Sequence, residues 1–235
     1  YGDHRDLHLS IRRQRQMCIR DRYYFSIPFW RAEVTRLALY MNDIEFVDHR
    51  ISDTERDQFK KNGQLPNGMI APFRQLPVLE VDGKIVAQTG AIARFCGKLA
   101  GMYPSDNDFN AARVDQIIEA AQDINYIVSI SGREKNLEKK ILARERLTKV
   151  HLPKWFQFLE NLLIENNESD WFVGNSMTIA DLAIWRLLGW LTSGLLDGVP
   201  KSVLDPYENL IELKSKISQH PKIKEWMLMK YGKEI

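Results

Sequence analysis

The character of the chain changes once, near residue 101, and this change limits the folds that it can adopt. Before this point, short runs with strand-like composition alternate with helical periodicity, whereas every apolar pattern after it has helical spacing. Residues 101–109 contain Gly, Pro, Ser, Asp and Asn, which are typical of a linker. A chain of 235 residues is long enough for two small domains. We therefore expect one domain at residues 23–100 and a second at residues 110–235.

The pattern of the first domain predicts a small α/β layer fold. Its expected elements are, in order, the end of a strand at 23–27, a helix at 31–41, a strand at 44–51, a hairpin at 76–87 and a helix at 91–100. Asp82-Gly83 is a strong two-residue turn signal inside the hairpin. The polar stretch around Gly63, Pro66 and Gly68 is expected to be a loop. A strand, a helix and a strand, followed by a hairpin and a covering helix, suit one layered domain.

The second domain is predicted to be entirely helical. One apolar stripe with helical spacing consists of Val114, Ile117, Ile118, Ala121 and Ile124. Residues 178–191 are so apolar that we expect them to form a buried helix. Thr178 and Asp181 have the spacing of a capping box at its start, with Asp in place of the usual Glu.

Composition excludes several classes of function. No apolar run approaches the roughly 20 residues that a membrane-spanning helix needs. Only two cysteines are present, so we expect neither a disulfide framework nor a metal site, and a reducing, cytoplasmic location is the simplest inference. The net charge of +2 suggests a basic protein, but it comes from residues 1–22, which contain six Arg and three Asp. The remaining residues have a net charge of −1. No nucleic-acid-binding face is therefore expected.

Residues 1–22 differ from the rest of the chain. They show neither strand alternation nor a capped amphipathic helix, and we exclude them from the fold argument. Three interpretations stay open: a basic arm, a disordered tail, or a non-native segment that resembles read-through of a sequencing adapter. We expect residues 1 to about 17 to pack poorly and to contribute little to stability, because they show no apolar periodicity.

Two short signals in the first domain point to a peptide ligand. Leu76-Pro77 opens the hairpin, where a proline is tolerated at a strand start and a cis bond would turn the Leu76 backbone towards a peptide. Gln88 and Thr89 stand at a predicted helix start, whose free N–H groups attract a carboxylate. Taken alone, each signal is better explained by an ordinary edge strand or a plain capped helix.

The combination of motifs resembles the cytosolic glutathione transferase family. The motifs that carry the resemblance are residues 76–83, 88–94 and 175–181, and it extends from Tyr23 to about residue 230. Tyr24-Phe25 followed by residues 31–36 looks most like the sigma class, which includes glutathione-dependent prostaglandin D synthases and lens S-crystallins. The resemblance implies a thioredoxin-like N-terminal domain followed by an all-α C-terminal domain.

The resemblance also implies site residues, with glutathione as co-substrate and no metal. Tyr24 would ionise the glutathione thiol through its hydroxyl, and Arg31 would lie beside it. The residues implied for glutathione binding are Lys60, Gln75, Leu76, Pro77, Gln88, Thr89 and, from the partner subunit of a homodimer, Asp123. Lys60 and Gln75 would bind the glycyl end, the Leu76 backbone the cysteinyl part, and Gln88 and Thr89 the γ-glutamyl carboxylate.

The implied activity is conjugation of glutathione to a small apolar electrophile, or glutathione-dependent isomerisation. Phe29 and Trp30 are candidates for the electrophile site, and packing inside the protein explains them equally well. The alternative is a non-catalytic protein of the same fold, either crystallin-like or a carrier of apolar ligands. The identity of the electrophile does not follow from the sequence.

One departure from the sigma pattern affects the catalytic assignment. Six residues separate Tyr24 from Arg31, where the family pattern has five. Tyr23 is therefore a rival for the catalytic role. Strand alternation puts the two tyrosine side chains on opposite faces of the sheet, so only one can serve. Tyr24 is preferred because it directly precedes Phe25, and we expect Tyr23 to pack against a helix.

Overall fold

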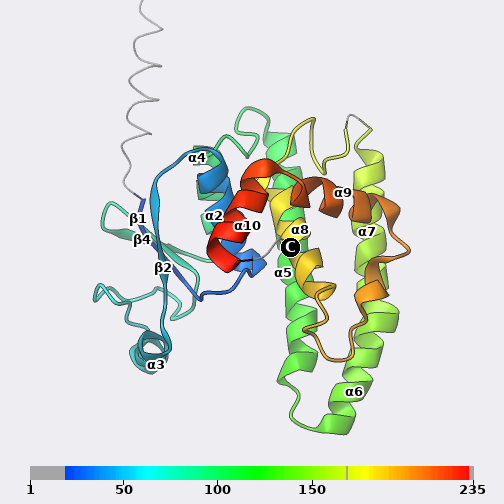
Figure 1. Cartoon of the computed structure of the whole chain (residues 1–235), viewed down its shortest axis with the longest axis horizontal. Helices are drawn as coiled ribbons and strands as arrows, with labels where there is room; N and C mark the ends of the chain where they lie inside the picture. The colour runs from blue at the N-terminus through cyan, green and yellow to red at the C-terminus, as the bar shows by residue number, and fades with distance from the viewer. Residues whose placement is uncertain (1–18, 168, 233–235) are drawn as a thin grey trace, which may run out of the picture. The chain divides into compact units, whose positions relative to one another are not determined.

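The computed structural model describes residues 19–167 and 169–232, which divide into two compact units between Gly101 and Met102. Four strands form the sheet of the first unit: β1 (Ile19–Tyr24), β2 (Phe46–Arg50), β3 (Val78–Val81) and β4 (Lys84–Ala87). Their order is β2-β1-β3-β4, with β1 and β2 parallel and β3 antiparallel to both neighbours (Figure 1). The expected turn joins β3 to β4. Both of its central residues, Asp82 and Gly83, have positive φ, which this type of hairpin turn requires.

Helices cover both faces of this sheet. On one face, α2 (Trp30–Met41) and α4 (Thr89–Leu99) bury an apolar cluster that includes Leu39, Leu79 and Cys96. On the other face, α3 (Asp53–Asn62) and the loop after it bury a second cluster, to which Tyr23 and Phe59 belong. The alternation of β3 divides its side chains between the two clusters. The first unit is thus the expected thioredoxin-like α/β layer domain.

The structure differs from the expected elements of the first unit in two places. The first strand begins at Ile19 and ends at Tyr24, so it includes residues that were assigned to the tail, and residues 25–29 form a loop instead of a strand end. Residues 1–18 of the expected tail lie outside the described residues. The polar stretch after Ile51 contains the helix α3, which was missed because Phe59 is its only buried residue.

The start of α3 is held by a capping box. The hydroxyl of Ser52 accepts a hydrogen bond from the Glu55 N–H at 3.3 Å, and the Glu55 carboxylate accepts one from the Ser52 N–H at 2.8 Å. Such a reciprocal pair satisfies two backbone donors that the helix itself leaves free.

Ser52→Ala is expected to lower the free energy of unfolding by about 1 kcal/mol, because it removes one half of this capping box. Denaturant unfolding measures the change. Thr54→Ala, at an exposed position in the same helical turn, serves as the control and should change stability by less than about 0.5 kcal/mol. Equal effects of the two substitutions would contradict a stabilising role for the box.

The described residues of the second unit are helical, as expected, apart from their connections. Its longer helices are α5 (Asp108–Arg133), α6 (Leu137–Arg146), α7 (Leu152–Glu165), α8 (Ile179–Leu191), α9 (Glu208–Ser218) and α10 (Pro221–Tyr231), with a short 3₁₀ turn at Lys201–Leu204. The predicted stripe of α5 is buried, and α5 packs against α8. Of the thirteen residues of α8, eleven are apolar or glycine. The helix is buried, as expected, and belongs to the core of the helical unit.

Two buried carboxylates cap helices of this unit. Asp181 is fully buried and accepts hydrogen bonds from the N–H groups of Phe172 and Thr178, at 2.9 and 2.7 Å, and from the Thr178 hydroxyl. Glu160 of α7 accepts the N–H groups of Asn209 and Leu210 in the first turn of α9. Both carboxylates thereby supply acceptors for N–H groups at a helix start that have no partner inside the helix.

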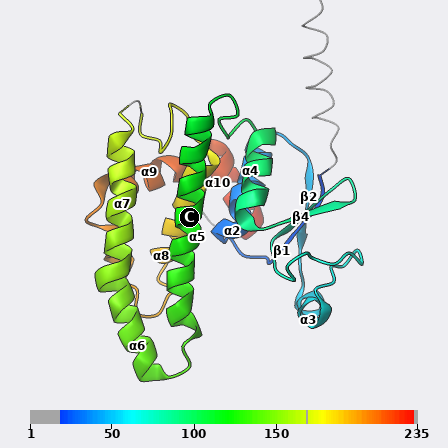
Figure 2. The same cartoon turned by 180° about the vertical axis from the view of Figure 1, so that it is seen from behind.

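A π-helical turn, Leu147–His151, joins α6 to α7, so that the three segments form one continuous rod (Figure 2). The N–H of Leu152 bonds to the Leu147 carbonyl, five residues back. Pro153 follows directly and has no N–H to donate, and its ring would crowd the carbonyl of Lys149 in a regular α-helix. The wider turn accommodates this proline without ending the rod.

Within the described part of the chain, no helix is long and apolar enough to cross a bilayer. The same residues contain no group of three His, Cys, Asp or Glu side chains that would hold a metal ion.

Candidate active site

Strand register brings most of the predicted site residues of the first unit to one end of the sheet. Tyr24 pairs with Arg50 at the ends of the parallel strands β1 and β2. Val78, the first residue of β3, pairs with Tyr23 on one side and with Ala87, the last residue of β4, on the other. The segments that leave or enter the sheet at this end therefore carry Tyr24, Leu76-Pro77 and Gln88 side by side.

Tyr23 and Tyr24 face opposite sides of the sheet, as expected. Tyr23 belongs to the cluster with Phe59 of α3, and its ring lies 4.9 Å from that of His49. The expected packing of Tyr23 against a helix is therefore confirmed. Tyr24 is 5% exposed, and among the described residues its hydroxyl has no hydrogen-bond acceptor. This leaves the hydroxyl of Tyr24 available to donate to a ligand.

The electrostatic surroundings of Tyr24 suit a neutral hydrogen-bond donor. Burial raises the pKa of Tyr24 above its ordinary value, while the positive charges of Arg31, Arg22 and Arg36 act in the opposite direction. The hydroxyl therefore keeps its proton at neutral pH. Three nearby cations also favour any anion that forms beside it.

Arg31, in the first turn of α2, is close enough to Tyr24 to influence its ionisation. Its Nε–H is buried without a hydrogen-bond partner, and no carboxylate of residues 19–167 or 169–232 forms an ion pair with it. An arginine that is not neutralised and lies beside a donor hydroxyl can stabilise a thiolate. This placement agrees with the role that the sequence implied.

The start of α4 has the features of an anion site. Gln88 is the N-cap residue, and its φ of 75° is unusual for a residue other than glycine. No side chain caps this helix, so the first N–H groups of α4 stay available. Strained backbone of this kind often marks a ligand site. The Leu76–Pro77 peptide bond is cis, as expected, and immediately precedes β3.

The structure places the remaining predicted residues less decisively. Lys60 is exposed on α3, with a weak ion pair to Asp57 at 3.9 Å, and Gln75 is exposed next to Leu76. Asp123 is exposed on α5 in the second unit. Phe29 is half-buried, but Trp30 is fully buried with its indole N–H unpartnered among the described residues. A buried Trp30 does not line an open electrophile site, so the packing alternative describes it better.

A buried ionic cluster beneath the loop at 25–29 was not predicted. Its members are Arg22 of β1, Glu33 and Arg36 of α2, and Asp48 and Arg50 of β2. Arg22 and Arg36 are both 0% exposed. Burial lowers the pKa of Arg22 to about 10, so this arginine stays charged at neutral pH. Burial opposes ionisation of Asp48, but Arg36 and Arg22 hold its pKa below the ordinary value.

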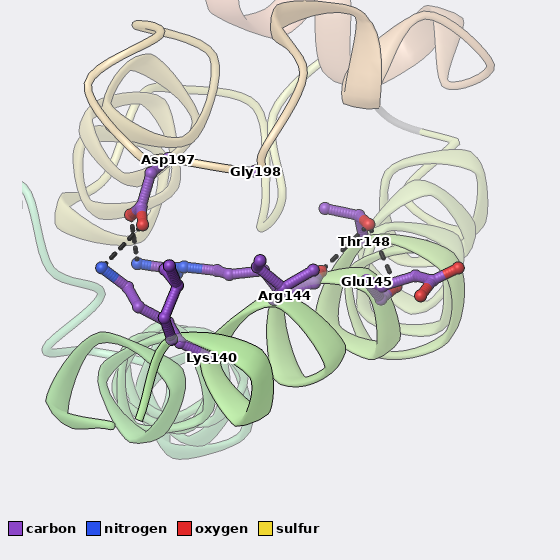
Figure 3. Close-up of a pocket in the computed structure, with 8 residues that line it drawn as sticks. Lys140, Arg144, Glu145, Thr148, Asp197 and Gly198 are labelled. Carbon is purple, nitrogen blue, oxygen red and sulfur yellow. Dashed lines mark hydrogen bonds and ion pairs between the residues drawn. The ribbon is translucent and has the colours of Figure 1, made fainter. Parts of the chain in front are cut away.

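Two pockets of the second unit, of about 370 and 490 Å³, contain none of the predicted site residues. In the smaller pocket, Lys140 and Arg144 converge on Asp197, at 2.6 and 3.3 Å (Figure 3). The hydrogen bond from Lys140 keeps the pKa of Asp197 below its usual value. One carboxylate already pairs with both cations, and neither pocket contains a predicted site residue, so we take the end of the sheet as the candidate active site.

Comparison with known families agrees with this architecture. The family profile "Glutathione S-transferase, N-terminal domain" matches residues 21–97, and "Glutathione S-transferase, C-terminal domain" matches residues 122–229. A glutathione S-transferase from Plasmodium yoelii yoelii is 33% identical over 162 residues, which cover 67% of this chain and 71% of that protein.

Solved structures give the same result. A prostaglandin D synthase of Nilaparvata lugens superposes with a TM-score of 0.75 at 28% identity and covers 88% of this chain and 96% of its own. A glutathione S-transferase of Necator americanus, described as monomeric, has a TM-score of 0.70 at 29% identity and covers 92% and 98%. On its sequence motifs, its two-unit fold and these matches, the chain belongs to the glutathione S-transferase family.

Proposed function

We propose that this protein binds glutathione at the end of the sheet and ionises its thiol through the hydroxyl of Tyr24. The thiolate would then attack a small apolar electrophile, or support glutathione-dependent isomerisation as in the sigma class. The observation that carries the proposal is the position of Tyr24 at the end of β1, where its ring is largely buried, its hydroxyl has no acceptor among the described residues, and Arg31 lies close enough to act on its ionisation.

The chemistry depends on shifting one proton equilibrium. A free cysteinyl thiol has a pKa of about 8.5, so only a few per cent is thiolate at pH 7. A hydrogen bond donated to the sulfur favours the charged form, and the positive charge of Arg31 adds to this effect. A shift of about two units, worth roughly 2.7 kcal/mol, would make most of the bound thiol nucleophilic at neutral pH. Tyr24 performs this task while it stays protonated.

The remaining residues at the end of the sheet bind the ligand. The Leu76 backbone pairs with the cysteinyl part, and the Gln88 amide and the first N–H groups of α4 donate to the γ-glutamyl carboxylate. Lys60 and Gln75 attract the glycyl carboxylate. Phe29 is half-buried and remains a candidate contact for the electrophile.

Gln88→Ala is expected to weaken glutathione binding about tenfold, because it removes a hydrogen bond to a carboxylate. The turnover number for a chlorinated dinitrobenzene at saturating glutathione should change little. Retention on immobilised glutathione and the KM for glutathione measure the effect. Gln58→Ala, at an exposed position on α3, is the control. A wild-type protein that neither binds glutathione nor turns over the electrophile would refute the proposed function and favour the non-catalytic carrier.

We further propose a homodimer in which Asp123 reaches the glutathione of the partner subunit. Asp115, Glu119 and Asp123 recur on one face of α5, although Asp115 already accepts a hydrogen bond from the Tyr103 hydroxyl at 3.1 Å. Sedimentation at micromolar concentration should give twice the 27.4 kDa of one chain. Because the Necator americanus relative is described as monomeric, a monomer that keeps full activity is a real alternative and would refute this assembly.

A further inference from the structure

The buried side chain of Arg36 is hydrogen-bonded to the backbone of the loop between Tyr24 and α2. The guanidinium of Arg36 donates to the backbone carbonyl of Phe25 at 3.3 Å and to that of Ile27 at 3.3 Å. It also donates to Glu33 at 3.1 Å and to Asp48 at 2.8 Å. Arg36 thus joins α2, β2 and the loop that directly follows Tyr24.

Only an arginine makes this set of contacts. Its guanidinium presents five N–H donors in a rigid planar fork, which here point to four acceptors on three separate segments. A lysine has the same charge, but its compact ammonium cannot span the two loop carbonyls and both carboxylates at once. The side chain of Arg36 is 0% exposed, so these contacts are shielded from bulk solvent.

Part of this loop is open to solvent. Ser26 and Ile27 are exposed, and the extra residue of this chain lies in the same segment. A second tether comes from Arg50, which donates to the Ser26 hydroxyl at 3.3 Å and to Asp48 at 2.8 Å. Asp48 therefore anchors both arginines that hold the loop.

We propose that Arg36 is a positioning residue, which holds the Phe25 and Ile27 carbonyls and thereby aims the Tyr24 hydroxyl and Arg31 at the glutathione sulfur. The proposal rests on the proposed function of Tyr24. Arg36 itself touches no substrate. The charged groups around Tyr24 are Arg22 on β1, with Arg31 and Arg36 on α2, and Glu33 and Asp48 balance the buried pair.

Arg36→Lys tests the proposal, because it keeps the positive charge and removes the planar set of N–H donors of the guanidinium. The thiol pKa of bound glutathione, followed by thiolate absorbance, should rise by about one unit, with a roughly tenfold loss of turnover at pH 6.5. Turnover should recover at pH 9, where the thiol ionises without help. The KM for glutathione should change less than threefold, because Gln88 and α4 are untouched.

Arg144→Lys is the matched control, since Arg144 is a buried arginine of the helical unit that also pairs with an aspartate. It should lower stability without moving the pH profile. A folded Arg36→Lys protein with the wild-type pH profile would overturn the proposal. If Arg36→Lys does not fold, the isosteric Asp48→Asn weakens the same anchor and must shift the profile in the same direction, or the proposal is wrong.

The failure of Tyr24 catalysis has a different signature. If Tyr24→Phe leaves the thiol pKa unchanged, the proposed function itself fails. If Tyr24→Phe raises the thiol pKa and neither Arg36→Lys nor Asp48→Asn does, only the positioning role of Arg36 fails.

Discussion

Replacing Tyr24 by phenylalanine is expected to reduce turnover tenfold to a hundredfold near pH 7, or by roughly 1.4 to 2.7 kcal/mol of barrier. The substitution removes one hydroxyl and leaves the ring, which packs 5.1 Å from Phe25. Without this donor, the thiol pKa of bound glutathione should rise by about two units. Thiolate absorbance titrated against pH measures that rise directly.

Glutathione affinity should change little in Tyr24→Phe, because Gln88 and the start of α4 are unaffected. Tyr23→Phe is the matched control: the same chemical change one residue earlier, on the α3 face of the sheet. A shift of the titration in Tyr23→Phe alone would move the catalytic assignment to Tyr23. If neither variant shifts it, the non-catalytic alternative becomes the better description.

Asp181→Ala is expected to lower the free energy of unfolding by about 3 to 5 kcal/mol, the largest stability effect among the changes considered. The substitution leaves the buried N–H groups of Phe172 and Thr178 without an acceptor, at a cost of about 1 to 3 kcal/mol each. Denaturant unfolding at pH 7.5 measures the loss. Asp170→Ala is the control, because it removes an exposed ion pair with Lys216 and should cost less than about 1 kcal/mol.

The effect of Asp181→Ala should also depend on pH. Burial raises the pKa of Asp181 to about 6, above its usual value of 3.8. The folded state therefore binds a proton more readily than the unfolded state, and this contribution to stability falls as the pH rises through that range. The difference between wild type and Asp181→Ala should thus be larger at pH 5 than at pH 7.5. An equal difference at both values would contradict the raised pKa.

Local signals predicted those parts of the fold that local interactions determine. The hairpin turn at Asp82-Gly83 needs only two residues that tolerate positive φ, and both adopt it. The helix α8 follows from a capping box and a continuous apolar run. The helix α3 was missed because apolar periodicity was the main criterion, although Ser52 and Glu55 have the spacing of a capping box that would have revealed it.

The ionic cluster shows why the rest did not follow from the sequence. Arg22 resembled part of a charged tail, but its guanidinium is buried and donates to the Ala32 carbonyl on α2 and to Asp48 on the neighbouring strand, 26 residues later. Arg36 lies outside the apolar stripe of α2 and therefore looks like a solvated residue, yet it is as buried as Leu37. Burial of a charge depends on partners that tertiary structure supplies, and no periodicity records them.

The π-helical turn at Leu147–His151 gives the rod of α6 and α7 an unusual tolerance to a change of length. Its hydrogen bond spans five residues instead of four, so this turn contains one residue more than the same turn of a regular α-helix. Loss of one residue here would restore regular helical bonding and leave the core-facing sides of α6 and α7 in register. The same deletion in the middle of α5, where bonding is regular, would rotate every later residue of that helix by about 100°. Relatives that differ in length by a single residue at this turn can therefore keep the same helical core.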